Sequence, residues 1–133
     1  MASDNEATEF LTVEDLVALA TMLLGDPPPI RDMGLLGSAA ARPATTVFGI
    51  DAYPDVWTKT AALLQSVVKN HALVDGNKRL AWLATAVLLD INGVPVVHAP
   101  NDGVYDLVLG VAAGDATVDE IATALRLLVS AGV

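Results

Sequence analysis

The stretch NKRLAWLATAVLLDIN, residues 77–92, contains the most apolar part of the chain, residues 80–91. Apolar residues fall on every side of a helix built from it, which is typical of a helix that is buried all round. Thr85 and Asp90 interrupt the run, and it is shorter than the roughly 18 to 20 apolar residues that span a bilayer. We therefore expect a core helix rather than a membrane helix, closed by Gly93, a residue that readily takes up a left-handed conformation.

Further helices are expected on both sides of this one, because apolar residues recur there at three- and four-residue spacing. They cover about residues 13–24, 32–41, 54–69, 102–113 and 118–130. Thr12 with Asp15, and Thr117 with Glu120, form the pattern of a capping box before the first and the last of them. With five or six helices and no internal repeat, the sequence predicts an all-α fold, a single compact helical bundle.

The segments between these helices show breaks and irregular stretches. Gly25 and the three prolines at residues 27–29 end the first helix, Arg42-Pro43 ends the second, and Pro54 suits the first turn of the next one. The stretch 44–53 keeps neither a helical nor a strand period, so we expect a surface loop there. Residues 94–97 are extended but have no second run to pair with, which makes a sheet improbable.

Composition limits the class of protein and its partners. A hydrophobic content of 53% in 133 residues is enough for one buried core, so we expect a flexible N-terminus over residues 1–10 and one helical domain over residues 11–133. Sixteen acidic residues against seven basic ones give a net charge of -9, which disfavours a direct nucleic-acid partner. The absence of cysteine, and of a secretory signal in the first residues, favours a cytoplasmic protein.

The densest cluster of reactive side chains lies just before the central helix and in its first turn. This cluster consists of His71, Asp75, Asn77, Lys78 and Arg79. The first N–H groups of a helix point outward unpaired at its positive end, where an anion can bind. The order of these residues therefore predicts a phosphate site.

Each residue type suits one task at such a site. Gly76 allows the backbone to approach a bound group closely, Asn77 can cap the helix or donate its amide, and Arg79 can donate two N–H groups to phosphate oxygens. Asp75 would hold Mg2+ against the phosphates, and His71 would take a proton from an attacking hydroxyl. Taken singly, each residue also has an ordinary explanation as a cap, a turn residue or a solvated charge.

The same residues carry a resemblance to a known family. The signature of the Fic and death-on-curing (Doc) superfamily, His-x-Phe-x-(Asp/Glu)-(Gly/Ala)-Asn-(Gly/Lys)-Arg, is matched by His71, Asp75, Gly76, Asn77, Lys78 and Arg79. Segments outside the motif, among them residues 34–36 and 41–43, are also similar to Doc-type chains, so that the resemblance covers nearly the whole sequence. The family's Phe is Leu73 here, a residue that can still fill an apolar pocket.

The resemblance implies a Fic/Doc-like fold and an activity. Fic enzymes transfer AMP and carry Gly after the motif's Asn, whereas the Doc type carries Lys there and transfers the terminal phosphate of ATP. This chain has Lys78 at that position, and Trp82 where Fic enzymes have a second Arg. The protein thus resembles a Doc-type toxin of a toxin-antitoxin pair. Such a toxin is a protein kinase that phosphorylates a threonine of elongation factor Tu, arrests translation and is held inactive by a cognate antitoxin.

The resemblance also implies the cofactors, ATP and Mg2+, and the roles of the site residues. The expected roles are catalytic base for His71, metal ligand for Asp75, and phosphate contact for Gly76, Asn77, Lys78 and Arg79. Three alternatives stay open. They are Fic-type AMP transfer, a catalytically idle helical module that binds a partner protein, and a metal hydrolase built on His71 and Asp75.

A few residues outside the motif are candidates for contacts with the substrate or for added charge at the site. Phe48 and Tyr53 belong to the stretch 44–53, where the superfamily places a flap that aligns its target. Trp82 could line a groove, although aromatic residues at helical spacing favour the core. Lys69 is expected to be solvated, or else to add positive charge to the site.

Overall fold

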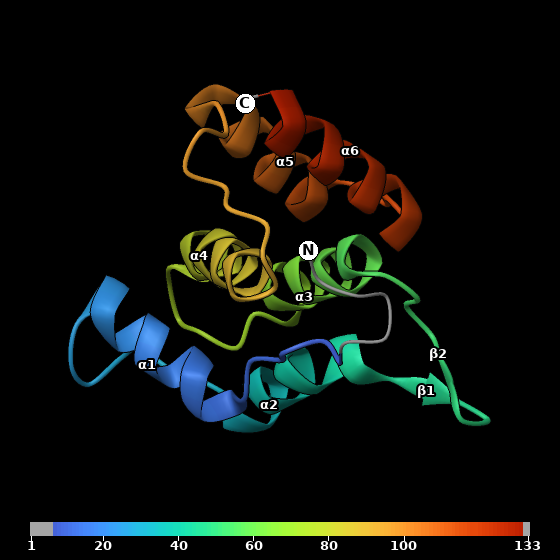
Figure 1. Ribbon diagram of the computed structural model, residues 1–133. Coiled ribbons are helices and arrows are strands. Elements are labelled where there is room, and N and C mark those ends of the chain that lie inside the picture. Colours follow the sequence, from blue (N-terminus) through green and yellow to red (C-terminus); the bar gives the residue numbers. More distant parts are fainter. Residues whose placement is uncertain (1–6, 132–133) are drawn as a thin grey trace.

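The computed structural model describes residues 7–131. Within them the chain forms six α-helices, one turn of 3-10 helix and a two-stranded hairpin (Figure 1). The elements are α1 (Val13–Leu24), α2 (Met33–Ala41), η1 (Arg42–Ala44), β1 (Thr46–Val47), β2 (Ile50–Asp51), α3 (Val56–Asn70), α4 (Asn77–Ile91), α5 (Asn101–Ala113) and α6 (Val118–Ala131). The prediction of an all-α helical bundle is confirmed.

Helices α3 and α4 form the centre of the bundle. Figure 1 shows them between two layers, α1 with α2 on one side and α5 with α6 on the other. Leu63 and Leu64 of α3 and Leu80 and Leu88 of α4 are almost completely buried. Helix α4 is therefore a core helix, as predicted, but the expectation that it is buried all round is wrong. Trp82 and Leu83 on its other side are only partly buried, and Ile91 at its end is exposed.

Local capping determines where the first and the last helix begin. The hydroxyl of Thr12 accepts from the Asp15 N–H at 3.1 Å, and the Thr12 N–H donates to the Asp15 carboxylate at 2.8 Å. Thr117 and Glu120 make the same reciprocal pair before α6. The backbone N–H of Thr117, and after it the Thr117 side chain, keep the pKa of the Glu120 carboxyl below its ordinary value. Both predicted capping boxes are confirmed.

The stretch 44–53 lies at the surface, as expected, but it is not a loop throughout. It contains an antiparallel hairpin in which Thr46 pairs with Asp51 and Val47 with Ile50. The turn between these strands has φ angles of +51° and +78°, and a two-residue turn with two positive φ angles suits the twist of a hairpin. The prediction failed because strands of two residues are too short to establish a period in the sequence.

A buried lysine ties this hairpin to α3. Lys59 is only 4% exposed, and its ammonium donates to the Asp51 carboxylate at 3.0 Å and to the Tyr53 carbonyl. The start of α3 also differs from the expected one. Asp55 is the N-cap and accepts from the Thr58 N–H at 2.8 Å, so Pro54 lies before the helix and not in its first turn.

The predicted flexible N-terminus falls mostly on residues 1–6, which lie outside the described residues. Glu9, within the described part, exchanges two backbone-to-amide hydrogen bonds of 2.9 Å with the side chain of Asn92. The segment before α1 is thus joined to the end of α4. In residues 7–131 no helix has the length and apolar character needed to cross a membrane.

Candidate functional site

The candidate base, His71, lies where α3 ends. It is the C-cap of that helix, with φ +51° and ψ +46°, a left-handed conformation that turns the chain away from the helix axis. The residue is exposed, and its imidazole makes no hydrogen bond with the residues that the structure describes. The side chain is therefore accessible to a substrate and is not buried in the core.

The loop that follows His71 lies against the proline-rich segment between α1 and α2. Ile30 and Leu73 form an isolated antiparallel bridge, and the Val74 N–H donates to the Pro29 carbonyl at 2.8 Å. The N–H groups of Arg31 and Asp32 both donate to the Ala72 carbonyl, at 2.7 and 3.0 Å. The sequence of residues 25–29 predicts only the end of a helix, and this pairing could not be predicted because the partners are far apart in the chain.

Leu73 and Asn77 are hydrogen bonded to each other across the loop. The Asn77 side chain accepts from the Leu73 N–H and donates to the Leu73 carbonyl, both at 3.0 Å, and Leu73 is 2% exposed. Asn77 therefore binds the loop instead of capping α4, where Gly76 occupies the N-cap position without a side-chain bond. A phosphate contact through the Asn77 amide stays a prediction, and it would compete with these two bonds.

Gly76 is needed for a different reason from the expected one. Its φ is +88°, and a Cβ at this position would lie 2.7 Å from the side chain of Leu24, at the end of α1. Any other residue would meet both the strained angle and this contact. The close approach that requires glycine is thus to the protein's own helix α1.

One cavity brings the candidate residues together. A hollow of about 380 Å³ lies at the N-terminal end of α4. It is lined by Val68, His71, Val74, Asp75, Gly76, Asn77, Lys78, Arg79 and Ala112. All six residues of the motif therefore line the same cavity. The sequence shows that they are neighbours in the chain, but not that their side chains face one space.

The charges at this cavity favour an anion. Lys78 and Arg79 are exposed in the first turn of α4, where the partial positive charge of the helix makes cations unfavourable. Neither forms an ion pair within residues 7–131, in which the pair Lys59 with Asp51 is the one found. Unpaired cations at a positive helix end are well suited to bind phosphate.

Asp75 supplies the acidic group of the cavity. One of its carboxylate oxygens accepts from the Gly76 N–H at 2.9 Å, and among the described residues the other oxygen has no hydrogen-bond partner. No group of three possible metal ligands occurs in this part of the chain. A single exposed carboxylate fits Mg2+ that is held mainly by a nucleotide's phosphates, and it suits a metal hydrolase poorly.

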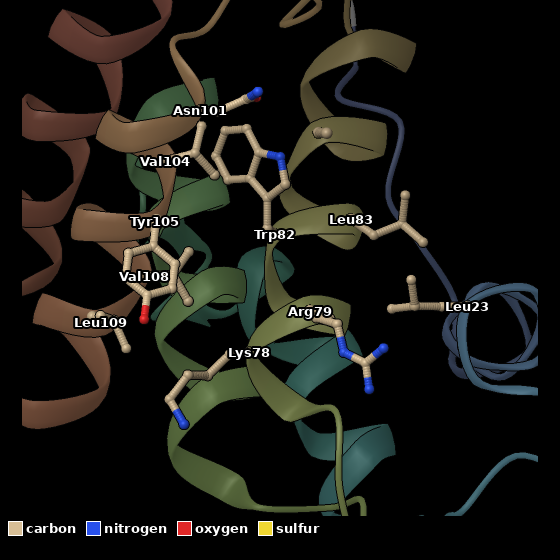
Figure 2. Close-up of a pocket in the computed structure, with 11 residues that line it drawn as sticks. Leu23, Lys78, Arg79, Trp82, Leu83, Asn101, Val104, Tyr105, Val108 and Leu109 are labelled. Carbon is tan, nitrogen blue, oxygen red and sulfur yellow. The ribbon is translucent and has the colours of Figure 1, made fainter.

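A second and larger cavity adjoins the first. It measures about 720 Å³, lies between α4 and α5 and shares Lys78 and Arg79 with the phosphate cavity. Figure 2 shows Lys78 directed to the α5 side of α4 and Arg79 to the α1 side, with the ring of Trp82 further along the helix. Trp82 packs against the core, as expected, but it is only partly buried and also lines this cavity together with Tyr105. The sequence contained no local signal for the cavity, since its walls belong to different helices.

Lys69 does not add its charge to the site in the expected way. Its ammonium donates to the carbonyls of Gly114 at 2.8 Å and Ala112 at 3.3 Å, and so joins the end of α3 to the end of α5. This lysine is exposed, but its role in the structure is to connect two helices.

The hairpin that holds Phe48 is far from His71. It precedes α3, whereas His71 follows it, and a helix of this length spans roughly 22 Å. None of the hairpin residues lines the phosphate cavity, and Figure 1 shows the hairpin away from the loop that joins α3 to α4. A role of Phe48 and Tyr53 in a flap that aligns the target stays a prediction, but neither residue lines the phosphate cavity. The segment beside the site is the one that contains Pro29 and Ile30.

Comparisons with known proteins place the chain in a family. A family model described as "Fic/DOC family" matches residues 10–89, which include the whole motif. The chain is 49% identical to "Toxin Doc" of Mycolicibacterium smegmatis over 119 residues, which cover 89% of this chain and 92% of that protein. It is 30% identical to "Protein kinase doc" of Escherichia phage P1 over 125 residues, covering 89% of this chain and 94% of the phage protein.

Proposed function

Because this chain belongs to the Fic/DOC family, we propose that it is a Doc-type toxin that transfers the γ-phosphate of ATP to a hydroxyl of a protein. The observation that carries the proposal is Lys78, an unpaired cation in the first turn of α4 that lines both cavities. A lysine side chain here leaves less room for a polyphosphate to run past than glycine would. It also supplies a point charge for a terminal phosphate.

The two cavities support ATP as the donor. The polyphosphate lies at the N-terminal end of α4, where Lys78 and Arg79 and the first N–H groups of the helix bind it. The apolar cavity beside it takes the base, which can stack on the aromatic rings of Trp82 and Tyr105. Mg2+, held by Asp75, would neutralise part of the charge on the phosphates.

The reaction needs a base next to the phosphate. His71 takes the proton of the substrate hydroxyl on an imidazole nitrogen. The hydroxyl oxygen forms a bond to the γ-phosphorus while the bond from that phosphorus to the bridging oxygen breaks, so that ADP leaves and a phosphorylated protein remains. Lys78 and Arg79 stabilise the negative charge that spreads over the transferred group.

The substrate and the regulatory partner are proposed on the strength of the family. A threonine of elongation factor Tu is the proposed acceptor, with arrest of translation as the consequence. One similar protein is named a toxin and another a protein kinase, which supports a toxin that acts by phosphorylation. A cognate antitoxin is proposed to bind this chain, because a toxin made alone would arrest its own cell.

The idle binding module has lost its main support. It was motivated by Leu73 in place of the family's Phe, yet Leu73 is buried and hydrogen bonded on both backbone groups. The loop is therefore packed without the aromatic ring. AMP transfer by the same residues remains the alternative that an experiment must separate.

Parallel incubations with γ-labelled and α-labelled ATP test the proposal. The purified protein and Mg2+ are added to cell extract, and proteins are separated by size. Label from the γ position but not the α position is expected on a protein of the size of elongation factor Tu. Label from the α position would show AMP transfer, and no label from either would refute a nucleotide-dependent transferase.

Replacement of His71 tests the base. His71→Ala should lower the rate of transfer by about 100-fold or more, because it removes general base catalysis. The melting temperature should not change, since the imidazole is exposed. His98→Ala is the matched control, an exposed histidine that lines neither cavity, and it should keep full activity. Equal activity of the two variants would contradict the role of His71.

A further inference from the structure

His71 is held in a conformation that its own side chain disfavours. With φ at +51° its Cβ lies too close to its carbonyl oxygen, which is why residues other than glycine seldom adopt this region. Within residues 7–131 the other such residue is Phe48, in the turn of the hairpin. Surrounding contacts must therefore stabilise His71 in this state, and its backbone angles determine where the imidazole points.

The contacts come from one segment that lies forty residues earlier in the chain. The guanidinium of Arg31 donates through Nη2 to the carbonyl of His71 itself. The N–H groups of Arg31 and Asp32 hold the next carbonyl, that of Ala72. Two consecutive carbonyls at the end of α3 are thus bound by the same short segment, directly at the left-handed residue.

Among residues 7–131, the His71 carbonyl is the one hydrogen-bond partner of the Arg31 side chain. Arg31 is exposed and forms no ion pair with the residues described. It lines neither the phosphate cavity nor the apolar cavity. Its bond satisfies one of the carbonyls that a helix leaves unpaired at its C-terminal end, where a positive charge is also favourable.

We propose that Arg31 is a positioning residue for His71. By binding the His71 carbonyl it keeps that residue left-handed and keeps the imidazole at the phosphate cavity. Arg31 does not contact the nucleotide and acts through His71 alone. The catalytic consequence rests on the proposed function, whereas the effect on the backbone of His71 does not.

A spectroscopic test is independent of any activity. In isotope-labelled protein, the coupling between the amide and α protons of His71, and its Cα chemical shift, report the left-handed φ. Arg31→Ala should move both toward values for ordinary helical or extended backbone. Arg126→Ala is the matched control, an exposed arginine at the far helix α6, and should leave both unchanged. An unchanged signature in Arg31→Ala would overturn the proposal even if the protein proves to be no transferase.

Kinetics then separate positioning from nucleotide binding and from stability. Arg31→Ala should lower kcat by roughly 10- to 100-fold while KM for ATP and the melting temperature stay the same. Millimolar guanidinium should restore part of the lost kcat in Arg31→Ala and none in His71→Ala. A rise in KM, a fall in melting temperature that accounts for the loss, or a failure of guanidinium to restore activity would each overturn the proposal. Arg31→Met, which keeps the aliphatic stem, repeats the measurement if the alanine variant folds poorly.

Discussion

Gly76 shows how a single residue joins the site to the core. It has a left-handed φ of +88°, and its Cα faces the side chain of Leu24 in α1. The family signature that the chain resembles accepts Gly or Ala at this position, but a methyl group here would contact Leu24 at 2.7 Å. In this protein the choice of glycine is therefore dictated by a neighbouring helix as well as by the backbone angle.

Gly76→Ala should destabilise the fold by about 1 to 3 kcal/mol, the range for a strained backbone residue. Denaturation in urea measures this cost in the native background and again in a Leu24→Ala background. The cost should be smaller when Leu24 has been shortened, because only the strained φ then remains. An equal cost in both backgrounds would show that the contact with Leu24 is unimportant.

At the scale of elements, the hairpin is joined to α3 by an ion pair in which one side chain is buried and the other is exposed. The side chain of Lys59 is 5% exposed and that of Asp51 is 57% exposed. Removing the carboxylate leaves an ammonium group buried with the Tyr53 carbonyl as its remaining partner. Removing the lysine leaves a carboxylate that water can solvate. Leaving the buried Lys59 without its carboxylate should therefore destabilise the fold more than leaving the exposed Asp51 without its lysine.

Asp51→Asn should destabilise the protein more than Lys59→Met, by about 1 kcal/mol or more. Methionine can fill the buried space of the lysine stem without a charge. Urea denaturation of the two variants gives the comparison, and hydrogen exchange of the Ala52 N–H, which donates to Thr45 at 2.9 Å, reports the hairpin itself. A more stable Asp51→Asn protein would contradict this account of the hairpin.

At the scale of the whole molecule, the net charge of -9 sets the phosphate site apart from the rest of the surface. Several of the seven basic residues are engaged in hydrogen bonds with other parts of the protein. Among them are Lys59, the exposed Lys69, and Arg42, which donates to Tyr53 and Gln65. Lys78 and Arg79 are exposed where the two cavities meet. An otherwise acidic molecule thus offers a small anion a local attraction while it repels long polyanions.

Calorimetry with ADP tests this distribution of charge. Lys78→Met and Arg79→Met should each weaken binding by about tenfold or more, the loss expected for a hydrogen bond to a charged group. Added salt should weaken binding to the native protein, and double-stranded DNA should not bind even at low salt. Arg126→Met should bind ADP as the native protein does. Tight DNA binding, or an ADP affinity that is unchanged in both Lys78→Met and Arg79→Met, would refute this interpretation.

The helices and the chemistry-bearing motif could be predicted from the residues because their causes are local. Capping pairs such as Thr12 with Asp15 lie three residues apart, and the apolar pattern of residues 77–92 repeats within each turn. The bounds of α1 and the position of His71 at the end of α3 follow from such signals. The hairpin was not predicted, because each of its strands has two residues and so covers only one repeat of a strand pattern.

The surroundings of the motif were decided by tertiary structure. Arg31 meets His71, Ile30 pairs with Leu73, and Leu24 contacts Gly76 across separations of forty residues or more. Both cavities likewise have walls from several helices. Such contacts arise only when the elements pack together, because burial of apolar surface brings distant segments into contact irrespective of their order in the chain.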